Sequence, residues 1–215
     1  VGIFTIDNGK VNALTFAMHE QLYSHLNEFL NDTTIKVGIL KGSEGKCFSA
    51  GDDLNEGDVY PEGEDTTQKI ISLPRNKPII AAVNSWCLGA GFIYLILLTD
   101  IRVAGNGARF GLPEIAYGMA GGSGSSRLPL HIPRVWANWI ALTGEKVTAD
   151  QALQYQLINE VVPDDEVFDR EQGDAALQLL ITGIAGTLNT DIISEGSTNL
   201  YYTQARFDSA FTAKS

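Results

Sequence analysis

The sequence has few of the residues that bind metals or form disulfides. Among its 215 residues there are 2 cysteines and 3 histidines. Cys47 and Cys87 do not have the spacing of a metal-ligand pair. We therefore expect no metal site, and we expect two reduced, packed thiols in a cytoplasmic protein.

Basic residues are also scarce. The sequence has 15 Lys and Arg but 26 Asp and Glu, which gives a net charge of −11 at pH 7. A surface potential of this sign repels the phosphates of nucleic acids. No basic stripe alternates with aromatic residues. The charge balance therefore argues against nucleic-acid binding.

Long apolar runs are missing as well. The longest, from Trp86 to Leu98, ends at a polar pair and is shorter than the roughly 20 residues that a membrane-spanning helix needs. The first residues, Val1 to Phe4, already have a strand pattern, so a leader peptide is either absent or not included. We expect no membrane segment, and the 44% hydrophobic and 19% charged content is that of an ordinary soluble globular protein.

Strand and helix patterns alternate through the first three quarters of the chain. Strands are predicted at 2–7, 35–40, 79–83, 100–104, 108–110 and 158–162. Helices are predicted directly after Thr15 and at 66–73, 134–143 and 148–156. These patterns predict an α/β fold with a core domain over 1–163 and a helical region over 164–215. The acidic segment 55–68 is expected to be a surface loop, which either gates a pocket or is merely solvated.

A glycine turn after the strand at 79–83 carries the strongest functional signal. The segment 84–95 opens through Gly89-Ala90-Gly91 onto an apolar helix, so free N–H groups and the positive end of a helix dipole point at whatever precedes the turn. A second small-residue turn, 48–53, offers another donor. Two such N–H groups that converge on one oxygen form an oxyanion hole. Close helix–strand packing is the alternative reason for these glycines, and a dinucleotide site is disfavoured because the third glycine is missing.

Glu114 is the acidic residue with two competing interpretations. It follows Pro113, so it is either a helix N-terminal acid that stabilises the dipole or a catalytic base. An apolar pocket would raise its pKa, as removal of a proton from carbon requires. The residues expected to form that pocket are Phe92, Ile93, Ile115 and Tyr117.

Nucleophilic serine chemistry has little support. The stretch 121–125 falls one glycine short of a nucleophile elbow. His19, His25 and His131 are predicted on surface helices or a loop, and we expect each of them to be solvated.

Several motifs together resemble the crotonase superfamily, the enoyl-CoA hydratase/isomerase group. They are Phe48-Ser49-Ala50-Gly51-Asp52-Asp53-Leu54, Asn84 through Gly91, Asp100, Phe110-Gly111-Leu112-Pro113-Glu114 and Leu142-Thr143-Gly144. The resemblance spans most of the chain, which is shorter than typical members at both ends. It implies a spiral of ββα units with a helical C-terminal region, assembled as a homotrimer or a dimer of trimers.

The resemblance also assigns roles to individual residues. The backbone N–H groups of Asp52 and Ala90 would form the oxyanion hole for an acyl-CoA thioester, and Glu114 would be the catalytic base. Coenzyme A would be part of the substrate, with no other cofactor and no metal. The residues expected around the substrate are Ala50, Gly51, Gly89, Gly91, Ile93 and Tyr117. The CoA phosphates need cations, for which Lys46, Arg75 and Lys77 are candidates.

One departure from the family pattern indicates the reaction. Family hydratases carry two glutamates, one on the helix after the glycine turn and one at the Pro-Glu motif. Here the first position is Ile93 and the second is Glu114. Addition of water needs two carboxylates, whereas a double-bond shift needs a single base that moves a proton between two carbons. The single glutamate therefore favours Δ3 to Δ2 enoyl-CoA isomerisation, as in similar family isomerases of fatty acid metabolism.

Other reactions on this scaffold remain open. Hydration, thioester hydrolysis or decarboxylation would follow if Asp52, Tyr94 or Tyr117 supplied a second acid, and a non-catalytic acyl-CoA-binding protein is a further alternative. The carboxylates of Asp52 and Asp53 are more simply explained as turn or cap groups, with the Asp52 side chain turned toward solvent. The stretch 118–126 has no acidic residue, which argues against the dehalogenase-like branch.

Overall fold

The computed structural model describes residues 1–56, 65–119 and 124–167, and all of them belong to one compact unit. Three predictions fall partly or wholly outside the described residues. They are the acidic loop predicted at 55–68, the glycine-rich stretch at 118–126 and the helical region at 164–215, of which residues 57–64, 120–123 and 168–215 are not described. Within the described residues no helix is long and apolar enough to cross a membrane.

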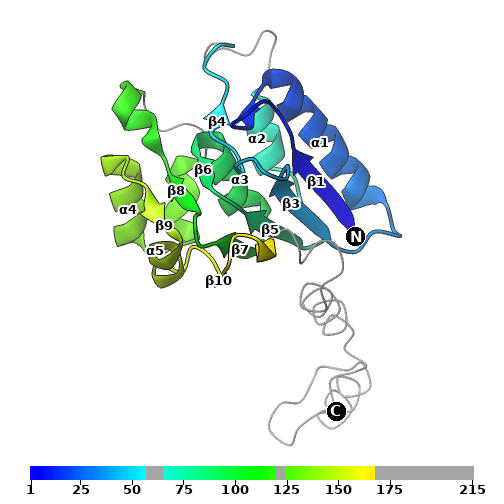
Figure 1. The fold of residues 1–215 in the computed structure, drawn as a ribbon. Coiled ribbons are helices and arrows are strands. Elements are labelled where there is room, and N and C mark those ends of the chain that lie inside the picture. Colours follow the sequence, from blue (N-terminus) through cyan, green and yellow to red (C-terminus); the bar gives the residue numbers. More distant parts are fainter. Residues whose placement is uncertain (57–64, 120–123, 168–215) are drawn as a thin grey trace, which may run out of the picture. The chain divides into compact units, whose positions relative to one another are not determined.

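The chain repeats a unit of two strands followed by a helix (Figure 1). The first unit is β1 (Gly2–Ile6), β2 (Ala13–Leu14) and α1 (Phe16–Asn31). The second is β3 (Gly38–Gly42), β4 (Gly51–Asp52) and α2 (Thr66–Ile71). The third is β5 (Ile79–Val83), β6 (Trp86–Leu88) and α3 (Gly89–Leu98). The fourth is β7 (Ile101–Gly105), β8 (Arg109–Gly111) and the 3-10 helix η1 (Pro113–Tyr117).

The rest of the described chain packs on the fourth unit. Its elements are the 3-10 helix η2 (Ser125–Leu130), α4 (Arg134–Thr143), β9 (Val147–Thr148), α5 (Ala149–Gln154) and β10 (Glu160–Val162). The predicted capping box of α5 is present, since the Thr148 side chain accepts from the Gln151 N–H and the Gln151 side chain accepts from the Thr148 N–H.

The first strands of the four units form one parallel sheet. Its order is β1-β3-β5-β7-β10, and every neighbouring pair is parallel. The second strands form a separate layer, in which β2 pairs with β4 and β6 pairs with β8. A parallel bridge between Ser49 and Cys87 joins these two pairs. In the first, third and fourth units the helix starts within two residues of the second strand, whereas residues 53–65 separate β4 from α2.

Element boundaries follow local hydrogen bonding. The predicted helix after Thr15 is confirmed, with the Thr15 hydroxyl accepting from the Met18 N–H. The strand predicted at 35–40 lies instead at 38–42, because Asp32 holds the preceding turn through the N–H and hydroxyl of Thr34. The short strand β6 was not predicted, since three residues give too little pattern.

Candidate active site

The two predicted turns meet at their glycines. Gly51 has φ +99° and Gly89 has φ +54°, a backbone region that only glycine adopts at low cost. A Cβ placed on Gly51 would lie 3.2 Å from the Gly89 Cα and 3.4 Å from the Ala90 nitrogen. The end of β4 and the start of α3 are therefore in backbone contact, which a side chain on either glycine would disturb.

The start of α3 lacks the side-chain cap that α1 and α2 have. Its N-cap residue is Leu88, which makes no side-chain capping bond, whereas Thr15 caps α1 and Asp65 caps α2. The first N–H groups of a helix have no intrahelical acceptor, and they carry the positive end of the helix dipole. The Ala90 N–H belongs to this first turn, so it is suited to bind an oxygen of a ligand.

The Asp52 amide is oriented by the β2–β4 pair. The Asp53 N–H donates to the Leu14 carbonyl at 2.8 Å, and Leu14 is the register partner of Asp52. Successive residues of a strand direct their N–H groups to opposite sides. The Asp52 N–H therefore points away from β2, while the neighbouring Gly51 touches Gly89. This geometry is compatible with the oxyanion role expected for Asp52 and Ala90.

Glu114 reaches this junction from η1. Its Oε1 lies 3.5 Å from the position that a Cβ on Gly89 would occupy. Its Oε2 is buried and has no hydrogen-bond partner among the described residues. Burial raises the pKa of the Glu114 carboxyl above its usual value; a hydrogen bond from its own backbone opposes this, and the negative charge of Asp52 adds to it. A poorly solvated carboxylate that lies against the glycine turn at the start of α3 is suited to proton transfer at carbon.

The position that is glutamate in family hydratases provides no acid here. Ile93 is buried, and its Cγ2 lies only 2.7 Å from the position that a Cβ on Gly124 would occupy. Of the four residues expected to surround Glu114, Phe92 and Ile93 are buried, whereas Ile115 and Tyr117 are exposed, Tyr117 by 68%. The Ala50 N–H donates to the Val11 carbonyl. The Ala50 carbonyl oxygen lies 3.8 Å from the position that a Cβ on Gly89 would occupy.

The prediction for His19 is wrong, because the side chain is buried and not solvated. It is 1% exposed on α1, with Nδ1 2.5 Å from the Tyr94 hydroxyl and Nε2 3.1 Å from Asp52 Oδ1. Sequence reasoning missed this group although a signal was available. His19 precedes Leu22 by three positions and Leu26 by seven, so helical spacing places it on the apolar face. His25 and His131 are exposed, as expected.

The Asp52 side chain is 59% exposed, in agreement with the expected turn toward solvent, yet it is held by His19. Asp53 acts as a turn residue, since its Oδ1 accepts from the backbone and side-chain N–H groups of Asn55.

The three cations expected near the CoA phosphates differ in position. Arg75 and Lys77 precede β5, so they lie at the edge of the sheet opposite the glycine turn that follows β5. Arg75 forms two hydrogen bonds to Asp100, at 2.8 and 3.0 Å, and Lys77 Nζ donates to the carbonyls of Phe29 and Asp32. Lys46 follows β3, so it lies at the same edge of the sheet as the glycine turn, and it pairs with Asp7. Lys46 is therefore the best placed of the three.

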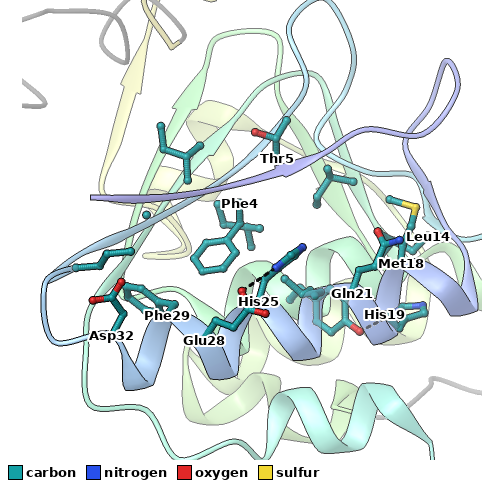
Figure 2. Close-up of a pocket in the computed structure, with 17 residues that line it drawn as sticks. Phe4, Thr5, Leu14, Met18, His19, Gln21, His25, Glu28, Phe29 and Asp32 are labelled. Atoms are coloured by element: carbon teal, nitrogen blue, oxygen red, sulfur yellow. Dashed lines mark hydrogen bonds and ion pairs between the residues drawn. The ribbon is translucent and has the colours of Figure 1, made fainter.

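A cavity of about 570 Å³ lies between β1 and α1, lined mainly by apolar side chains such as Phe4, Leu14 and Phe29 (Figure 2). His19 and Tyr94 form part of its wall, but neither the two glycine turns nor Glu114 lines it. The candidate site at the junction of the turns is therefore separate from this cavity.

The described residues contain no group of three or more His, Cys, Asp or Glu side chains that could hold a metal ion. Both cysteines are free and buried, as expected, and burial raises the pKa of each thiol.

Comparison with known sequences gives a consistent result. A family model described as enoyl-CoA hydratase/isomerase matches residues 1–187. The chain is 42% identical over 160 residues to a 2,3-dehydroadipyl-CoA hydratase from Escherichia coli (strain K12), covering 72% of this chain and 62% of that protein. It is 36% identical over 178 residues to a carnitinyl-CoA dehydratase from Salmonella arizonae, covering 77% of this chain and 66% of that protein. The chain thus spans just under two thirds of the length of these relatives.

Solved structures agree with the sequence matches. An enoyl-CoA hydratase from Mycobacterium tuberculosis H37Rv has a TM-score of 0.70 and 33% identity, covering 85% of this chain and 71% of that chain. An enoyl-CoA hydratase from Mycobacterium paratuberculosis has a TM-score of 0.69 and 27% identity, covering 99% and 86%.

Proposed function

The chain belongs to the enoyl-CoA hydratase/isomerase family, with the crotonase-like α/β fold that its motifs predicted, and from this premise we propose that it moves the double bond of a 3-enoyl-CoA thioester to the 2-position. The thioester carbonyl accepts hydrogen bonds from the N–H groups of Asp52 and Ala90. Each such donor contributes roughly 3 kcal/mol to stabilisation of a developing oxyanion.

Glu114 carries out the proton transfers in this proposal. Its carboxylate takes a proton from C2, and the electrons of the C–H bond pass into the thioester to form an enolate. The resulting carboxylic acid then returns a proton to C4, which leaves the double bond between C2 and C3. Substrate and product have the same atoms, and the sequence needs neither a metal nor a redox cofactor, because coenzyme A is carried by the substrate.

One observation carries the proposal. Oε2 of Glu114 has no hydrogen-bond partner within residues 1–56, 65–119 and 124–167, and the carboxylate lies against Gly89, in the same turn as the Ala90 amide. On α3, the position that is glutamate in family hydratases is Ile93, which is aliphatic and provides no second acid. A base and a pair of amides without a companion glutamate suffice for migration of a double bond.

The test is an assay of the protein with 3-enoyl-CoA and 2-enoyl-CoA thioesters. We expect double-bond migration, with kcat lowered by about 10²–10⁴-fold in Glu114→Gln because the positioned base is lost. Glu28→Gln, which changes an exposed carboxyl on α1, serves as the matched control and should keep full activity. Rapid hydration that survives Glu114→Gln, without migration, would overturn the proposal, as would the absence of turnover with every thioester.

Reversible hydration is the second candidate, and two observations favour it. The relatives cited above are named as a hydratase and a dehydratase. The charge of Asp52 acts on Glu114, so a second carboxylate is near the base. If Asp52 supplies the missing acid, Asp52→Asn should abolish hydration of a 2-enoyl thioester and leave migration of a 3-enoyl thioester intact.

A further inference from the structure

The buried polar chain Asp52–His19–Tyr94 is the feature that the proposed mechanism does not use. His19 Nδ1 lies 2.5 Å from the Tyr94 hydroxyl and Nε2 lies 3.1 Å from Asp52 Oδ1, and the first of these contacts is visible in Figure 2. One neutral tautomer satisfies both contacts: Nδ1 accepts from the tyrosine hydroxyl and Nε2–H donates to the carboxylate. A buried imidazole with both nitrogens paired has a defined orientation.

The three residues come from the elements that build the oxyanion hole. Asp52 ends β4 and contributes one of the two proposed N–H donors. Tyr94 lies four positions after Ala90, the residue whose N–H is the other proposed donor, so the two residues are on the same face of α3. His19 lies on α1, a third element. The His19 imidazole on α1 therefore contacts both β4 and α3.

The Asp52 carboxylate needs such a restraint. It is 59% exposed, and its negative charge already acts on Glu114. An unrestrained carboxylate beside the hole would repel the negative charge that develops on the enolate oxygen. A hydrogen bond from the His19 Nε2–H fixes the side chain and partly neutralises its field.

We propose that His19 is a positioning residue of the oxyanion hole: its Nε2–H bond holds Asp52, whose backbone N–H is one of the two donors, and the Tyr94 hydroxyl orients the imidazole for that bond. This inference rests on the proposed function of the site and adds to it a residue that touches no substrate.

Two nearly isosteric variants separate positioning from packing. The side-chain amide nitrogen of Gln can replace Nε2 and keep the bond to Asp52, whereas the shorter Asn can replace only Nδ1 and keep the bond to Tyr94. We expect His19→Asn to lower kcat by about 10–100-fold, the range for loss of a hydrogen bond to a charged group, with KM little changed. His19→Gln should retain most of the activity. Equal losses in both variants would overturn the proposal.

The matched control lies on the same helix. His25 is 61% exposed, and the structure gives its imidazole one carboxylate neighbour, Glu28, so His25→Asn should leave kcat and KM unchanged. A double-mutant cycle tests the partner: in an Asp52→Ala background, which removes the acceptor of the His19 bond and keeps the backbone amide, His19→Asn should cost less than about twofold. Fully additive losses would exclude action through Asp52.

A final measurement does not depend on turnover. Amide hydrogen exchange should become faster in segment 49–53 of His19→Asn, where the bond to Asp52 is lost, but not of His19→Gln or His25→Asn, at matched folded fractions. Unchanged exchange would overturn the positioning role even if the enzyme is active. Faster exchange in a protein that turns over no thioester would support the role of His19 and refute the proposed function.

Discussion

Single residues at the site combine reactivity with a cost in stability. The Glu114 carboxylate is poorly solvated, so the folded state disfavours its charged form, and burial raises its pKa above the usual value. The same shift that makes it a better base for carbon acids reduces the stability of the fold at neutral pH. Enzymes often place such groups at their active sites.

Glu114→Gln should raise the melting temperature at pH 7. The folded pKa exceeds the unfolded pKa, so the folded state binds more protons between the two values and stability falls as pH rises through this window. Above the window the wild type carries the full penalty, which an uncharged Gln avoids. Thermal unfolding of both proteins from pH 4 to pH 8 measures this; the advantage of the variant should shrink as the pH falls. An advantage that grows at low pH would contradict the assignment.

The charge of Asp52 should be visible in the pH dependence of catalysis. Glu114 must be ionised to act as a base, so kcat/KM should fall as the pH drops through its raised pKa. Asp52→Asn removes one of the causes of that raised pKa, so the midpoint of the acidic limb should move to lower pH. Asp53→Asn is the matched control, because its carboxylate is not among those causes, and its midpoint should not move.

At the scale of elements, α3 must be held rigidly because its first turn carries a proposed donor. Arg102 on β7 binds the other end of this helix. Its guanidinium donates to the carbonyls of Leu95, Ile96 and Thr99 and to that of Leu157. The last carbonyls of a helix have no intrahelical donor, so a buried cation with a planar fork satisfies several of them at once.

Arg102→Lys should therefore destabilise the protein by about 2–4 kcal/mol, because an ammonium group cannot reach all these carbonyls and leaves some of them buried and unpaired. Urea unfolding followed by circular dichroism measures the change. Arg109→Lys is the control, since Nη1 of Arg109 donates to nearby carbonyls within its own turn, and we expect a loss below about 0.5 kcal/mol. Equal losses would show that the contact with α3 has no special role.

At the scale of the whole molecule, the exposed apolar face of α4 is the feature that bears on assembly. Val135, Trp139 and Leu142 are exposed at spacings of four and three residues, which places them on one side of the helix. The opposite side packs inward through Ala137 and Ile140. A row of large exposed apolar side chains is unfavourable in water and is typical of an interface. We propose that this face contributes to the homotrimer that the family resemblance implies.

Light scattering coupled to size-exclusion chromatography tests this assembly. We expect the mass of a trimer or of a dimer of trimers, and Trp139→Lys should shift the protein toward monomer because a charge would have to be buried in the interface. Lys36→Ala, far from α4 in the sequence, should leave the mass unchanged. A monomeric wild type would refute the proposed assembly.

The sequence by itself determined what depends on neighbouring residues. The alternation of strands and helices, the caps at Thr15 and Thr148, the glycine turns and the replacement of a family glutamate by Ile93 are local patterns, and such patterns survive any change in long-range packing. The tertiary structure decided the environment of each side chain. His19 meets Asp52 33 positions away and Tyr94 75 positions away, and Glu114 meets Gly89 across two elements. Helical spacing alone indicates that His19 is buried. The partners of His19 and Glu114 come together only when the units pack against one another, so no short segment encodes them.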